Sequence, residues 1–154
     1  MLSILSLLHV VAVVIWVGGM FFAYNFLRPA AGTLLEPPER LSLWVDVFKR
    51  FFPYVWVAVI LLPLTGYVMV FMRWDSMGNA PIYVHVMNGL GTLMILIYMH
   101  VFFAPFKRLK NAVQEKNWPE GGAALAQIRF LVKINTALGV LVVMIASGGR
   151  FFIY

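Results

Sequence analysis

The side chains with the greatest capacity for chemistry are three histidines and nine methionines, because the chain contains no cysteine. Imidazole and thioether groups bind soft and borderline metal ions such as Cu(I), and imidazole also ligates haem iron. The lack of thiolates excludes a disulfide framework, a Cys-ligated zinc site and a Cys-ligated iron–sulfur cluster. Any metal or cofactor must therefore be held by His, Met, carboxylate or backbone groups.

His9 and His85 are the strongest ligand candidates. At helical spacing, His9 shares a face with Ala12 and Trp16, and His85 shares a face with Asn88. Both histidines are expected in the outer half of the predicted bundle, where polar groups turn inward because exposure to lipid is costly. His100 lies close to a basic loop and is the weaker candidate.

A first hypothesis from these residues is a b-type haem. His9 and His85 would be axial ligands, Trp16 would form an aromatic wall, and cations would pair with the propionates. The matching cations are Arg73 and Arg150. The function would then be electron transfer, with a quinone or a periplasmic redox protein as the partner.

A second hypothesis is copper uptake or resistance. Soft ligands are expected around the same outer mouth, namely Met72, Met77, His85 and Met87. Met69 is expected at the same mouth, and for haem either outer histidine could instead pair with Met87 or Met69. A third hypothesis is a non-catalytic scaffold whose histidines only pack, since methionine is also a common core filler.

The sequence offers few residues for other kinds of metal binding or catalysis. Asp75 is the only acidic residue expected on the outer side, which argues against a calcium or magnesium cage and against paired-carboxylate catalysis. The sequence also lacks a Gly-rich phosphate loop, an HExxH motif and a G-x-S-x-G elbow. Whether the protein is an enzyme stays open.

Membrane-spanning helices must position these residues. The chain is 62% hydrophobic and 12% charged, against about 45–50% and about 25% in soluble domains. Uncharged runs cover 1–27, 51–72, 76–106 and 134–149, and about 20 apolar residues cross a bilayer. We expect one all-α integral membrane domain over 1–154, an antiparallel bundle of four transmembrane helices. Their expected bounds are about 3–26, 52–72, 82–104 and 131–150.

The basic residues indicate the orientation. Ten of the twelve lysines and arginines fall after the first and third predicted helices, at positions 28, 40, 49, 50, 107, 108, 110, 116, 129 and 133. The positive-inside rule then places these loops in the cytoplasm and both termini on the periplasmic or exterior side of a bacterial inner membrane. The net charge of +6 is thus a topology signal, and no nucleic-acid partner is expected. The bilayer is the expected partner, and a homo-oligomer is left open.

The first cytoplasmic loop contains an amphipathic segment at about 39–50. Its apolar residues recur at helical spacing beside charged residues: Leu41, Trp44, Val45 and Phe48 beside Arg40, Asp46, Lys49 and Arg50. This pattern predicts a short interfacial helix.

Residues 8–22 (LHVVAVVIWVGGMFF), followed by Leu27-Arg28-Pro29, resemble the opening of the copper resistance protein D (CopD) domain, in which a helical His precedes a Trp-x-Gly-Gly turn of helix. The four-helix layout is also similar to small members of that group. The resemblance implies copper handling across the inner membrane. More distantly, this helix resembles HemJ, a membrane protoporphyrinogen oxidase associated with b-type haem, which would implicate His9, Trp16 and Arg28. The chain departs from HemJ in having no His soon after Arg28, so CopD is the closer family.

Overall fold

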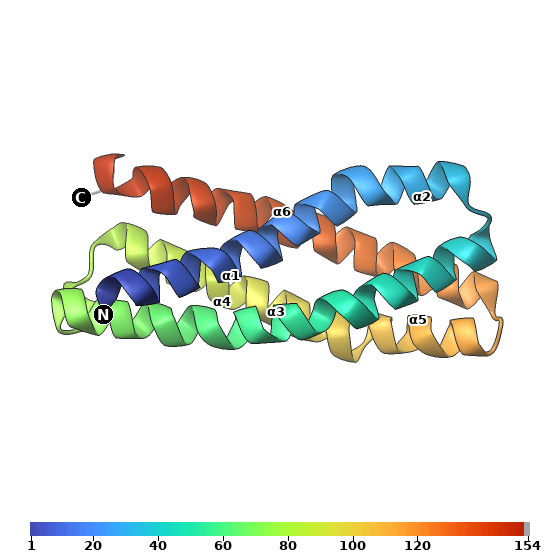
Figure 1. Cartoon of the computed structure of the whole chain (residues 1–154), viewed down its shortest axis with the longest axis horizontal. Coiled ribbons are helices and arrows are strands. Elements are labelled where there is room, and N and C mark those ends of the chain that lie inside the picture. Colours follow the sequence, from blue (N-terminus) through green and yellow to red (C-terminus); the bar gives the residue numbers. More distant parts are fainter. Residues whose placement is uncertain (153–154) are drawn as a thin grey trace.

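The computed structural model describes the backbone of residues 1–152 and the side chains of residues 1–149. The chain forms a bundle of four long helical rods, and the described residues include no strand (Figure 1). Within this described part, four segments are long and apolar enough to cross a membrane: Leu2–Leu34, Pro37–Trp74, Ile82–Gln114 and Trp118–Gly149. The predicted all-α architecture with four spans is confirmed.

The first rod is a helix interrupted by one wide turn. Helix α1 (Leu2–Phe22) passes into a π-helical turn, η1 (Ala23–Leu27), and then into α2 (Arg28–Leu34). Ala12 on α1 and Ala31 on α2 both face the interior. At about 100° per residue, an ideal helix would turn these two positions roughly 100° apart, and the extra residue of a π turn restores the alignment. With η1 and α2 included, the first rod extends well past the predicted bounds of 3–26.

The second rod is a single helix, α3 (Pro37–Trp74), of 38 residues. Glu36 is extended, Pro37 occupies the first helical position and Glu39 lies in the first turn, an arrangement that favours a helix start. Pro53 and Pro63 lie inside α3 without ending it, and Asp75 ends it in the left-handed conformation with φ 62°. The expected helix at 52–72 is thus the second half of a longer element.

The amphipathic segment 39–50 is helical as predicted, but it forms the beginning of α3 and not a separate interfacial helix. Its apolar side chains are buried inside the bundle, where the ring of Phe48 packs edge-on against Phe106, with centroids 5.8 Å apart. Leu41 lies beside Gly121 in the same region. Since protein covers this apolar face, the segment has no need to lie on the lipid surface.

The other two rods carry the second half of the chain. A short 3-10 turn, η2 (Met77–Asn79), leads into α4 (Ile82–Phe103), and α5 (Pro105–Gln114) follows. Ala104 separates α4 from α5, with φ −110° and ψ −85°, because Pro105 has no N–H for the helical ladder. The last rod, α6 (Trp118–Phe152), begins much earlier than the predicted 131–150. The side chain of Asn117 caps it by accepting a hydrogen bond from the Glu120 N–H at 3.3 Å.

The rods are longer than a bilayer is thick. At about 1.5 Å per residue, α3 spans about 57 Å, whereas the hydrocarbon core measures about 30 Å. We call the end of the bundle with residues 28–50 and 105–133 the basic end, and the end with the N-terminus and residues 72–87 the hairpin end (Figure 1). The basic end carries most of the charges, so it is the part that must extend beyond the hydrocarbon.

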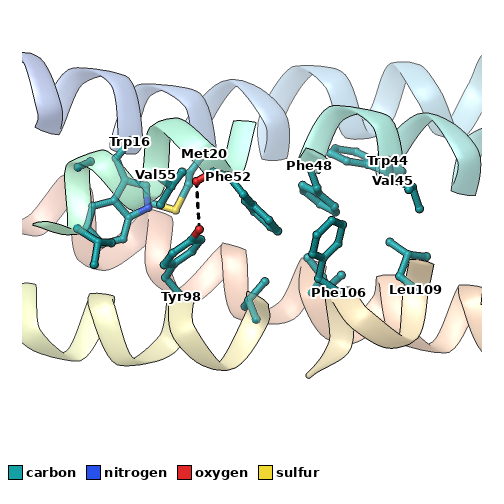
Figure 2. Packing of buried hydrophobic residues seen from close by; sticks show 14 of the residues in the cluster. Trp16, Met20, Trp44, Val45, Phe48, Phe52, Val55, Tyr98, Phe106 and Leu109 are labelled. Atoms are coloured by element: carbon teal, nitrogen blue, oxygen red, sulfur yellow. Dashed lines mark hydrogen bonds between the residues drawn. The ribbon is translucent and has the colours of Figure 1, made fainter. Parts of the chain in front are cut away.

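Phe52 of α3 connects the two halves of the bundle core (Figure 2). Its ring centroid lies 5.5 Å from that of Tyr98 on α4 and 4.8 Å from that of Phe106 on α5. The Tyr98 hydroxyl also donates a hydrogen bond to the Phe52 carbonyl oxygen at 3.2 Å. One residue of α3 thereby holds helices on both sides of the break at Ala104.

Gly139 of α6 lies where α1 and α4 approach α6 closely. A Cβ atom there would lie 2.9 Å from Cγ2 of Val17 and 3.1 Å from Cε of Met94, and Val17 is β-branched and cannot move aside easily. We predict that Gly139→Ala lowers the free energy of unfolding by about 1–3 kcal/mol. Unfolding in detergent micelles measures this change.

Gly89→Ala on α4 is the matched control, because a Cβ at Gly89 meets nothing within 4 Å. Alanine favours a helix over glycine by up to about 1 kcal/mol, so this variant should be at least as stable as the starting protein. Equal stability of the two variants would contradict the close approach of α1, α4 and α6 at Gly139.

Candidate functional site

His9 and Thr65 form a polar pair between two apolar helices near the hairpin end. Nδ1 of His9 on α1 lies 2.7 Å from the hydroxyl oxygen of Thr65 on α3. Thr65 is only 2% exposed, and His9 is half-buried. The two residues are joined because α1 packs mainly against α3. A polar pair that is hydrogen-bonded in this way avoids the high cost of an unpaired polar group in a membrane.

The hydrogen bonds around Thr65 determine which nitrogen of His9 carries the proton. The Thr65 hydroxyl donates to the carbonyl oxygen of Leu61 at 2.6 Å, so its own hydrogen is already used. We therefore assign the ring proton of His9 to Nδ1, from which it donates to the Thr65 oxygen. This leaves Nε2 as the unprotonated nitrogen, and Nε2 makes no hydrogen bond to any described residue. A His oriented through its other nitrogen is typical of a metal ligand.

The residues of α3 near His9 include a glycine without a side chain and a methionine with a soft sulfur atom. The ring of His9 approaches α3 at Gly66, where a Cβ would lie 3.4 Å from Cε1. Met69 is one helical turn from Thr65 on the same face of α3 and is half-buried. Met69 lies between the His9–Thr65 pair and the hairpin end. The face of α3 that meets His9 therefore carries a thioether one helical turn beyond Thr65.

The other predicted ligands lie at the hairpin end without a joining interaction. Met72 is 41% exposed, and Met77, His85 and Met87 are half-buried. These residues come from the last turn of α3, from η2 and from the start of α4, so the α3–α4 hairpin keeps them at one end of the bundle. Among the described residues, no group of three or more His, Asp or Glu side chains could hold a metal. A soft-metal site here would therefore draw on methionine sulfur beside histidine.

The residues predicted to hold haem are not brought together. His9 is bonded to α3, whereas α4, which carries His85, packs mainly against α6. Trp16 is buried at 2% exposed and packs edge-on against Tyr98. Arg73 is exposed with its guanidinium over the Trp74 ring, 5.6 Å from the centroid. The side chain of Arg150 lies outside the described residues. The haem hypothesis gains no support from this geometry.

Two cavities open between the rods, and no histidine lines either of them. The first, which we call the arginine cavity, measures about 270 Å³ and contains the side chains of Arg28, Arg40 and Arg129 on its wall. The second, which we call the central cavity, measures about 330 Å³ and is almost wholly apolar. Ala23, Phe48 and Val132 line both cavities, so the two are adjacent.

Asn135 is a buried polar residue that sequence reasoning missed. It is 3% exposed on α6, lines the central cavity, and donates from Nδ2 to the Met94 carbonyl oxygen at 3.3 Å. Its Nδ2 also lies 3.7 Å from Sδ of Met20. Its Oδ1 has no partner among the described residues. The sequence did contain a sign of it. Asn135 is an amide near the start of an uncharged run in α6, and polar side chains in such runs usually form hydrogen bonds between helices.

Comparison with known proteins gives one match. A family model, copper resistance protein D (CopD), matches residues 45–148. No curated protein and no solved structure matches the chain. The matched range runs from α3 to α6 and does not include residues 8–29, on which the resemblance to the same family was recognised. The family match therefore rests on residues 45–148, separate from the residues that carry the resemblance in the sequence.

We predict that nitrogen NMR finds His9 protonated at Nδ1 and unprotonated at Nε2. Replacing His85 and His100 with Gln leaves His9 as the only histidine, so its ¹⁵N signals are unambiguous. Thr65→Val removes the acceptor with little change of shape and should abolish the preference for this tautomer, whereas Thr65→Ser should preserve it. A proton on Nε2 in the protein with Thr65 intact would contradict the assignment.

Proposed function

The chain belongs to the copper resistance protein D family, and on this premise we propose that it binds Cu(I) between α1 and α3, with Nε2 of His9 as a ligand. It is a multi-pass membrane protein with four helices suited to spanning a bilayer. The observation that carries the proposal is the chain of hydrogen bonds from His9 to Thr65 to Leu61. This chain leaves a lone pair on Nε2 in the outer half of the bundle.

The donor set suits copper in its reduced state. Cu(I) prefers soft thioether sulfur and imidazole nitrogen, and Met69 supplies a thioether on the face of α3 that carries Thr65. A carboxylate cage for a hard cation is not available among the described residues. The site therefore selects a soft ion by ligand type, and copper is the substrate that it handles, not a permanent cofactor.

A route to this site begins at the hairpin end. Met72 is exposed, and Met77, His85 and Met87 are partly accessible. Met69 follows Met72 by one helical turn toward the interior. We propose that these residues deliver Cu(I) to Met69 and His9 by exchange between weakly held soft ligands. Sulfur ligands on a hairpin can exchange because no described residue locks them into a hydrogen-bonded cluster.

We predict that His9→Ala and Met69→Leu weaken Cu(I) binding by the purified protein. Competition with a coloured Cu(I) chelator under reducing conditions measures the affinity. Thr65→Val should weaken binding about 10–100-fold, because loss of an orienting partner typically costs that much in metal affinity. His9→Ala should cost more, because it removes the ligand itself.

His100→Ala and Met99→Leu are the controls for this experiment. Both residues are exposed on α4, far along the helix from the hairpin end, so their replacement should leave the affinity unchanged. Equal losses in these controls would overturn the site. A haem absorption spectrum from protein grown in haem-replete cells, lost in His9→Ala, would assign His9 to haem and would also overturn the copper site.

We also propose that the basic end faces the cytoplasm and the hairpin end faces the periplasm or exterior. The support is the excess of Lys and Arg at the basic end. Because the chain has no cysteine, a single introduced thiol reports its own location. We predict that a membrane-impermeant maleimide labels Gly78→Cys in intact cells with a permeable outer membrane. The same reagent should label Gln114→Cys only after lysis, and the reverse pattern would contradict the orientation.

A further inference from the structure

The arginine cavity at the basic end has the composition of a site for an anionic amphiphile. Arg28, Arg40 and Arg129 come from α2, α3 and α6, and no acidic residue lines the cavity. None of the three guanidinium groups has a carboxylate within ion-pair distance in the described part of the chain, although Arg50 and Arg108 do. Three arginines that line one cavity without an ion-pair partner among the described residues attract an anion.

The π turn holds one of these arginines in place. Arg28 donates from Nε to the carbonyl oxygen of Tyr24 at 3.2 Å, and its guanidinium lies 4.5 Å from the centroid of the Tyr24 ring. Tyr24 belongs to η1, and both residues line the cavity. A π turn inside an α-helix often marks a functional site. The remaining N–H groups of Arg28 stay available for a ligand.

The level of the cavity matches the head groups of a bilayer. The uncharged part of α3 begins at Phe51, just after Lys49 and Arg50, and that of α6 begins after Lys133. The hydrocarbon boundary therefore lies near these cations. Phe48 and Val132, which line both cavities, lie at this boundary. The arginine cavity is on the head-group side of it, and the central cavity is on the hydrocarbon side.

We propose that the protein binds an anionic phospholipid here, with the phosphate among Arg28, Arg40 and Arg129 and an acyl chain in the central cavity. Trp44 and Trp118 line the arginine cavity and suit the interfacial region. The central cavity supplies an apolar path beyond Phe48, lined by Phe51 and Val55 among others. A basic pocket beside an apolar cavity is the arrangement that binds acidic lipid head groups.

The test measures lipid binding to delipidated protein by native mass spectrometry. Phosphatidylglycerol should bind more tightly than phosphatidylcholine. Arg28→Gln and Arg40→Gln should each weaken phosphatidylglycerol binding roughly fivefold, the effect expected for one basic residue near an acidic lipid. Lys49→Gln is the matched control, because it removes one charge from an exposed site on α3 that lines neither cavity, and it should change binding less than twofold.

Two further arms separate the head group from the chain. Glycerol phosphate should not displace the lipid at matched concentrations, since it lacks an acyl chain. Val132→Phe narrows the junction of the two cavities and should reduce phosphatidylglycerol binding, with circular dichroism confirming that the helices are intact. Equal binding of the two lipids, or equal losses in Lys49→Gln and Arg40→Gln, would overturn the proposal. Displacement by glycerol phosphate would show that the site takes a soluble phosphate and would also overturn it.

Discussion

The packing of Phe52 between Tyr98 and Phe106 is the constraint on which the rest of the bundle depends. Pro105 interrupts the helical ladder between α4 and α5, so side-chain packing must keep the two parts of that rod in line. Phe52 contacts aromatic rings on both sides of the break, and Tyr98 adds a hydrogen bond to the Phe52 backbone. Because Phe52 and Tyr98 also line the central cavity, the same packing shapes the space between the rods.

The buried polar groups follow from the low polarity of the surroundings. A membrane gives them no water, so each must find a partner on a neighbouring helix or remain at high cost. His9 finds Thr65, and Asn135 finds the Met94 carbonyl group. These bonds join α1 to α3 and α4 to α6. With the proton of His9 assigned to Nδ1, the Thr65 bond also leaves Nε2 without a hydrogen-bond partner among the described residues.

The two proposed sites lie at different positions along the bundle. The candidate soft ligands lie toward the hairpin end, on α1, α3, η2 and α4, while the three arginines line a cavity at the basic end. The two regions share no lining residue, so a change in one can leave the other intact. The long rods make this separation possible, because only part of their length is needed to cross the hydrocarbon.

The amino-acid sequence by itself determined the class of structure. Long uncharged runs without strand-like alternation cross a bilayer as helices that satisfy their own hydrogen bonds, so three spans follow from the sequence, and the fourth follows if the flanking Lys133 and Arg150 reach the interfaces. The ligand types also followed, since a chain without cysteine leaves His and Met. The family was recognisable in the residues around His9 and Trp16, although the matching family model covers a later part of the chain.

Tertiary packing decided which residues contact one another. Periodicity identified the apolar face of residues 39–50, but only the presence of α5 and α6 decided that this face packs against protein and not against lipid. Likewise, both His9 and His85 were ligand candidates in the sequence, and the pairing of α1 with α3 gave His9, but not His85, a hydrogen-bonded partner on a neighbouring helix. Asn135 and the arginine cavity were unforeseen for the same reason. Spacing along a chain fixes which residues share a face, but the face that a helix meets depends on the whole bundle.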